Sequence, residues 1–99
     1  MAEYATKSVI IGRKKDAGRI FAFIALFDIN DPHKSAKPPK KILEFAGARN
    51  VRIYGCDIKY MLAGNDIIIN DLEKVQIEEK EGRVIVRGCQ EKNKTLNLS

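Results

Sequence analysis

The fold of this chain is decided by residues 50–88, which read NVRIYGCDIKYMLAGNDIIINDLEKVQIEEKEGRVIVRG. Short runs of apolar and polar residues alternate here, and turn-forming clusters such as 63–66 and 80–82 separate them. A period of two between turn clusters is typical of antiparallel strands with one buried face and one solvated face. The stretch therefore predicts a meander of short strands, at residues 51–54, 58–62, 67–69, 75–78 and 83–87.

Two more strands are predicted upstream of the meander, over residues 6–14 and 19–29. The turn between them contains Gly18, which can adopt a positive φ. Residues 20–27 are apolar on both faces, and the three phenylalanines in this run favour a strand over a short buried helix. A strand that is buried on both sides needs a cover on each face, from a helix of the same chain or from a second copy.

A short helix is predicted for residues 40–46. Two prolines precede it, Ile42, Leu43 and Phe45 give it an apolar side, and Gly47 stands at the position of a C-cap. A helix of two turns is marginal in isolation, so it would have to dock on the sheet. A strand over the same residues is the alternative.

The chain is expected to form a single domain over residues 1–99. Residues 30–41 hold three prolines and four lysines and predict a flexible basic loop, and residues 90–99 predict a polar tail. The fold class that follows is mainly β, bordering on α+β. We expect an antiparallel meander that forms a twisted sheet or a partly open small barrel, with one short helix.

One internal similarity lies within these predicted strands. Residues 51–56 (VRIYGC) resemble residues 84–89 (VIVRGC) at an offset of 33. A solenoid needs about three or more repeats, so two occurrences do not predict one. The similarity is interpreted as two strand ends of the same kind.

Bulk composition indicates a soluble globular domain. The 99 residues are 44% hydrophobic and 31% charged, which suffices for one core without disulfides or metal. The longest apolar run, 20–27, is too short to span a bilayer, and the first residues lack the pattern of a secretory signal. These features predict a cytoplasmic protein without a membrane partner. Two cysteines are too few for a secreted disulfide framework.

The net charge of +5 is distributed unevenly along the chain. Residues 1–52 contain eleven basic and five acidic side chains, whereas residues 53–99 contain seven basic and eight acidic ones. The first half therefore carries +6 and the second −1. A basic half of this kind favours a polyanionic partner.

No catalytic, metal or cofactor site is predicted. His33 is the single histidine, and it stands in the basic loop without a neighbour that would make it a general base. No Cys-x-x-Cys, His-x-x-x-His or calcium-loop spacing occurs. The segment 12–18 has glycines and bases but lacks the ending of a phosphate-binding loop. The chain is therefore expected not to be an enzyme and to bind no cofactor.

The leading prediction is a small basic module that binds DNA or RNA. Basic residues that displace counterions and tyrosines that stack on bases are the groups such binding needs. The predicted nucleic-acid-binding residues are Arg13, Lys14, Lys15, Arg19, Lys34, Lys37, Lys40, Lys41, Arg49, Arg52, Tyr54, Lys59 and Tyr60.

The alternative prediction is a self-assembling structural or adaptor protein that acts through β-edges and the apolar strand. A homo-oligomer is expected in either case.

Overall fold

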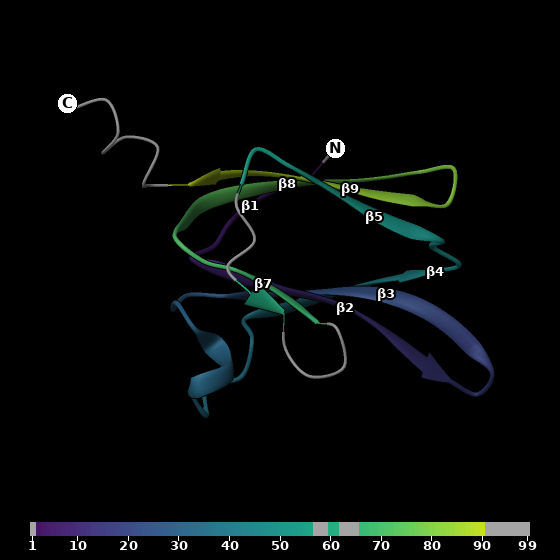
Figure 1. Cartoon of the computed structure of the whole chain (residues 1–99), viewed down its shortest axis with the longest axis horizontal. Helices are drawn as coiled ribbons and strands as arrows, with labels where there is room; N and C mark the ends of the chain where they lie inside the picture. Colours follow the sequence, from purple (N-terminus) through teal and green to yellow (C-terminus); the bar gives the residue numbers. More distant parts are fainter. Residues whose placement is uncertain (1, 57–59, 62–65, 91–99) are drawn as a thin grey trace.

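The computed structural model describes residues 2–56, 60–61 and 66–90, and their strands form two stacked layers (Figure 1). The prediction of a mainly β fold is confirmed, and the described strands do not close into a barrel. Predictions that fall on residues 57–59, 62–65 and 91–99 lie outside the described residues. In spatial order, sheet A consists of β1 (Ala2–Ala5), β8 (Leu72–Lys80), β9 (Arg83–Gln90) and β5 (Asn50–Tyr54). Sheet B consists of β4 (Lys41–Ala46), β3 (Arg19–Phe27), β2 (Ser8–Asp16), β7 (Ile67–Ile69) and β6 (Tyr60–Met61).

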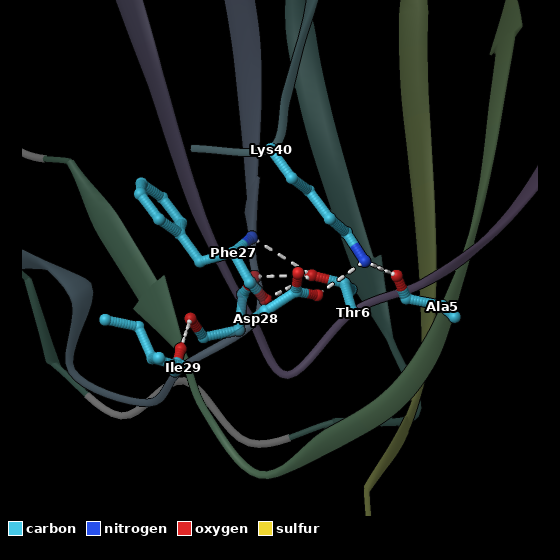
Figure 2. Close-up of polar contacts among 7 residues, drawn as sticks. Ala5, Thr6, Phe27, Asp28, Ile29 and Lys40 are labelled. Atoms are coloured by element: carbon cyan, nitrogen blue, oxygen red, sulfur yellow. Dashed lines mark hydrogen bonds and ion pairs between the residues drawn. The ribbon is translucent and has the colours of Figure 1, made fainter. Parts of the chain in front are cut away.

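A bent two-stranded ribbon connects the two sheets. One side of the ribbon is β1 followed by β2, and the other is β7 followed by β8; the pairing is antiparallel throughout. At the bend, the Leu72 N–H donates to the Lys7 carbonyl at 2.9 Å. The buried Thr6 hydroxyl accepts a hydrogen bond from the Phe27 N–H at 3.1 Å (Figure 2). Backbone pairing between the two strands of the ribbon therefore continues through the bend from one sheet to the other.

The core lies between the two sheets, where alternate residues of each strand meet. Because side chains alternate across a strand, one face of every long strand points into this space. The sheet B side chains in the core include Val9, Ile11, Ile24 and Leu26, and those of sheet A include Leu72, Val75, Val84 and Val86. Each of these eight is at most 2% exposed.

The outer face of sheet B, the face turned away from sheet A, is also apolar. Phe23, Ala25 and Phe27 point to this side and are no more than 8% exposed. The segment that follows β3 lies against this face (Figure 1). Its Pro39 lines a depression of about 290 Å³ together with Phe23 and Phe27, and its Pro32 is buried. The strand predicted over 20–27 is confirmed, and the loop supplies part of its second cover. The flexibility of the loop stays a prediction.

The predicted helix at 40–46 is wrong, because these residues form β4 and pair antiparallel with β3. Since β3 is buried on both faces, its backbone N–H and C=O groups need partners on both edges. The hairpin with β2 satisfies one edge and β4 satisfies the other. Among the described residues, the helical structure is a single 3-10 turn at Pro32–Lys34, and no helix is long enough to cross a membrane.

The predicted meander is correct for some neighbours and wrong for β5. β8 and β9 form an antiparallel hairpin, and β6 pairs with β7. β7 and β8 lie in different sheets, however, and β5 pairs in parallel with β9. Strands that follow one another in the sequence are therefore not always hydrogen-bonded neighbours in a sheet.

The internal similarity at an offset of 33 marks this parallel pair. Val51 lies opposite Val84 and Tyr54 opposite Arg87, so the two similar segments run side by side in register. The glycines that follow them come into close approach. A Cβ added to Gly55 would stand 2.9 Å from the carbonyl oxygen of Gly88. The repeated glycine thus reflects close contact between two backbones.

Two chain corners clasp each other through asparagine and aspartate side chains. The Asp31 N–H donates to the Asn70 side-chain oxygen at 3.0 Å, and the Asn70 amide donates to Asp31 at 2.7 Å. The exposed partners repeat the pattern, because the Asp71 N–H donates to Asn30 at 3.0 Å and the Asn30 amide donates to Asp71 at 3.1 Å. Both aspartates have positive φ. These side chains join the corner after β3 to the corner after β7.

Candidate nucleic-acid interface

The outer face of sheet A, the face turned away from the core, is polar and open to solvent. Val84 and Val86 of β9 point into the core, so Arg83, Ile85 and Arg87 point the other way. In β5 the same alternation places Arg52 and Tyr54 on the outer face. Together these strands present an exposed surface that is rich in arginine.

The parallel pairing of β5 with β9 brings these outer residues into rows. Tyr54 lies opposite Arg87, and the Arg87 guanidinium stands 4.9 Å from the centre of the Tyr54 ring. Arg52 lies opposite Ile85, and Asn50 lies opposite Arg83. We call the set Arg52, Tyr54, Arg83 and Arg87 the arginine face. Its cations and its ring are exposed, with Tyr54 at 46%.

The rest of the outer face adds two lysines and two carboxylates. Lys74 and Lys80 stand on β8, and Glu3 and Glu78 carry the opposing charge. Glu3 accepts a hydrogen bond from the Gln76 amide at 3.0 Å and lies 3.8 Å from the Lys74 ammonium. This acid is therefore occupied at the β1 edge, and the excess of positive charge lies toward β9 and β5.

The β2–β3 hairpin, which carries the predicted residues Arg13, Lys15 and Arg19, is joined to this face through Arg49. The Arg13 guanidinium donates to the Arg49 carbonyl. Arg49 in turn contacts the β8–β9 turn, where its N–H donates to the Gly82 carbonyl at 2.7 Å and its guanidinium to the Glu81 carbonyl at 3.3 Å. Arg83 follows that turn directly. The structure thus brings Arg49 and the predicted basic residues of the hairpin to one end of the molecule, with Lys15 and Arg19 exposed on the hairpin. Lys14 is exposed there too, and its ammonium lies 5.0 Å from the centre of the Phe23 ring.

The basic residues of the loop lie apart from these. Lys34 and Lys37 follow the end of β3 that is remote from the hairpin tip (Figure 1). Lys40 forms an ion pair with Asp28 at 2.8 Å and donates to the Ala5 carbonyl (Figure 2). The Lys41 ammonium stands 5.4 Å from the centre of the Tyr4 ring. Lys40 therefore contacts Asp28 and Ala5, and Lys41 lies against Tyr4. Lys34 and Lys37 follow the end of β3 opposite to the hairpin tip.

Two predicted residues have no described side chain. Lys59 lies outside the described residues, and for Tyr60 the structure describes the backbone pairing of β6 with β7. Sequence reasoning missed Arg83 and Arg87, together with Lys74 and Lys80. The alternation Arg83-Val84-Ile85-Val86-Arg87 was a signal for an outward arginine pair. The sequence contains no signal that β5 would lie beside it, other than the similarity at an offset of 33.

A metal site finds no supporting arrangement in the part of the chain that is described. There, no group of three or more histidine, cysteine or carboxylate side chains comes close enough to hold a metal ion. His33 is exposed in the 3-10 turn.

Comparison with known proteins assigns no family, because no family model, curated protein or solved structure matches the chain. The functional argument therefore rests on the geometry of the arginine face.

Proposed function

We propose that the protein binds single-stranded nucleic acid through the arginine face. One observation carries this proposal: the parallel β5–β9 pair sets an exposed tyrosine against an arginine, with two more arginines on the same open surface. Aromatic rings and guanidinium planes are the groups on which unpaired bases stack. Arginine also contacts phosphate through two parallel hydrogen bonds.

The shape of the site favours single strands over duplexes. An α-helix or a two-stranded ribbon fits the major groove, which is roughly 12 Å wide. The arginine face belongs to a sheet of four strands spaced about 4.8 Å apart, which is too broad to enter that groove. Splayed bases of a single strand, by contrast, can lie flat on an open sheet face.

The basic residues at the end of the sandwich offer a continuation of the site. Arg49 links the β8–β9 turn to the β2–β3 hairpin, and Lys15 and Arg19 lie farther along that hairpin. A strand crossing Tyr54 and Arg83 would reach this band with its phosphates. We expect the arginine face to set the stacking contacts and the hairpin to add charge contacts.

The test is a titration of labelled single-stranded DNA, single-stranded RNA and duplex DNA at low and at physiological salt. A triple variant, Arg52→Gln with Arg83→Gln and Arg87→Gln, should weaken single-strand binding and reduce the salt slope by about 2, since each phosphate contact on a single strand contributes about 0.7. The matched control removes the same charge from the other end, as Lys34→Gln, Lys37→Gln and Lys41→Gln. It should leave binding nearly unchanged.

Tyr54 provides a second, charge-neutral test. Tyr54→Ala should weaken single-strand binding by roughly 1–3 kcal/mol through loss of stacking, and Tyr54→Phe should restore it. Absence of binding to every probe at low salt, or equal losses in the two triple variants, would overturn the proposal. A homo-oligomer, the other predicted partner, stays a prediction.

A further inference from the structure

A carboxylate lies in the middle of the outer face of sheet A. Glu78 of β8 lies opposite Ile85 of β9, and Ile85 lies opposite Arg52 of β5, so the three form one row across the sheet. With strands about 4.8 Å apart, Glu78 and Arg52 stand on either side of Ile85, about 9.6 Å from each other. Arg83 and Arg87 are diagonal neighbours of Glu78, at roughly 7–8 Å.

The carboxylate of Glu78 is available to a ligand. Of the two carboxylates described on this face, Glu3 accepts a hydrogen bond from Gln76 and lies beside Lys74. Glu78, in contrast, forms no hydrogen bond or ion pair with the other described residues. Both Glu78 and Ile85 are partly exposed. A ligand that lies over Ile85 would therefore meet an acceptor that has no partner among the described residues.

A carboxylate at this place does not serve contact with phosphate. Like charges that meet at an interface disfavour binding, so Glu78 opposes the backbone that the arginines around it attract. A carboxylate accepts hydrogen bonds only, and in nucleic-acid complexes it takes them from donors on the bases. Glu78 is therefore suited to recognise the edge of a base.

We propose that Glu78 selects guanine in the single strand bound by the arginine face, an inference that rests on the proposed function. Unpaired bases are recognised on their Watson–Crick edges. Guanine presents two adjacent donors there, the N1–H and the 2-amino group, which match the two oxygens of one carboxylate. Adenine and cytosine place a ring nitrogen acceptor beside their amino group, and uracil and thymine have one donor between two carbonyl oxygens. In those four bases an acceptor would face a carboxylate oxygen, which leaves both unsatisfied.

The residues around Glu78 complete a site for this base. With its donor edge toward Glu78, the guanine ring lies over Ile85, which supplies an apolar floor. The O6 and N7 atoms of guanine are acceptors, and arginine is the side chain that most often contacts both. Arg83 and Arg87 flank Ile85 along β9, so a guanidinium is at hand on either side of the base. Tyr54 lies in the next row, where it can stack on the following base.

The test is a titration of labelled oligothymidylate that carries one central guanine, inosine, adenine or cytosine. The wild type should bind the guanine strand about tenfold more tightly than the adenine or cytosine strand, which is the discrimination expected of one bidentate contact. Inosine lacks only the 2-amino group of guanine, so its strand should bind with intermediate affinity. This comparison uses the wild type alone and does not depend on how well a variant folds.

Two variants then locate the preference. Glu78→Gln replaces one acceptor with a donor and should abolish the preference for guanine without weakening binding to plain oligothymidylate. Glu79→Gln is the matched control, because it removes the same charge from the next residue of β8, which is exposed and points to the opposite face. That variant should keep the preference, and thermal melts check that both variants stay folded.

The possible failures are distinguishable. Equal affinity of the wild type for all four strands would overturn the guanine preference and leave the proposed function standing. A preference that survives in Glu78→Gln would overturn the assignment to this carboxylate. Absence of binding to every strand at low salt would overturn the proposed function and this inference with it.

Discussion

The outer faces of the two sheets differ in what they leave exposed to water. On sheet B the outer face buries Phe23, Ala25 and Phe27, and the loop after β3 lies against it. On sheet A the outer face exposes arginines and Tyr54. In both sheets, alternate residues of each long strand point inward and form the core. The difference shows that a strand apolar at every position requires a cover, whereas an alternating strand leaves a face free for binding.

The largest effect expected from this difference is at Phe23. Phe23→Asp places a charge on the covered face and removes a buried ring, which should lower the free energy of unfolding by about 3–5 kcal/mol or prevent folding. The matched change on the open face, Tyr54→Asp, should cost about 1 kcal/mol or less. Urea denaturation of both variants measures this. Similar losses would show that the two faces are not differently covered.

The next effect concerns the clasp that fixes the covering loop. Asn70 is 4% exposed, and Asn70→Ala removes two hydrogen bonds to Asp31, at an expected cost of about 2 kcal/mol. Limited trypsin digestion should then cut faster near Lys34 and Lys37, which are the sites expected to be cut first in the wild type. The exposed counterpart Asn30→Ala should have a smaller effect. Unchanged digestion of Asn70→Ala would show that the clasp does not hold the loop.

A smaller loss of stability is expected from a substitution at Gly12, which lies beside the Phe23 ring. A Cβ added at Gly12 would meet the Asp66 carboxylate and stand 2.7 Å from that ring, so Gly12→Ala must displace both side chains. Because a side chain can shift more readily than backbone, we expect a loss of about 1 kcal/mol. Thermal unfolding measures it, and a variant as stable as the wild type would place the ring elsewhere.

The smallest effect should come from the open face. The triple change Arg52→Gln, Arg83→Gln and Arg87→Gln should alter stability by about 0.5 kcal/mol or less for each residue, since exposed charges contribute little to folding. The same variant is expected to weaken nucleic-acid binding. Urea denaturation checks the first expectation. A large loss of stability would indicate that these arginines serve the fold rather than a ligand.

Much of the strand pattern could be predicted because period-two alternation reports which residues face a core. The strand at Leu72–Lys80 follows this rule, whereas Arg19–Phe27 is apolar on both faces and its phenylalanines indicated a strand. The wrongly predicted helix at 40–46 has a different origin. Propensity and the two prolines favoured a helix, but the unpaired edge of a fully buried strand required a neighbour, and that need is not local.

The candidate site was less predictable than the fold. Arg52 and Tyr54 were chosen from charge and aromatic content, and both lie on the arginine face. Arg83 and Arg87 were missed because they belong to the half of the chain with no net positive charge. A parallel pair between strands 33 residues apart brings the four together, and composition along the chain cannot report such a contact.

The bent ribbon also has a consequence for how the protein folds. β1 pairs with β8, so Ala2 must find Ile77, and Val9 must find Ile69. Contacts between such distant parts of the chain slow folding, because a long loop must close before they form. β2 and β3 can form their hairpin early, but β1 has no described partner until residues 74–77 have left the ribosome. During synthesis the first strand therefore waits for residues 74–77 before it can pair as it does in the folded protein.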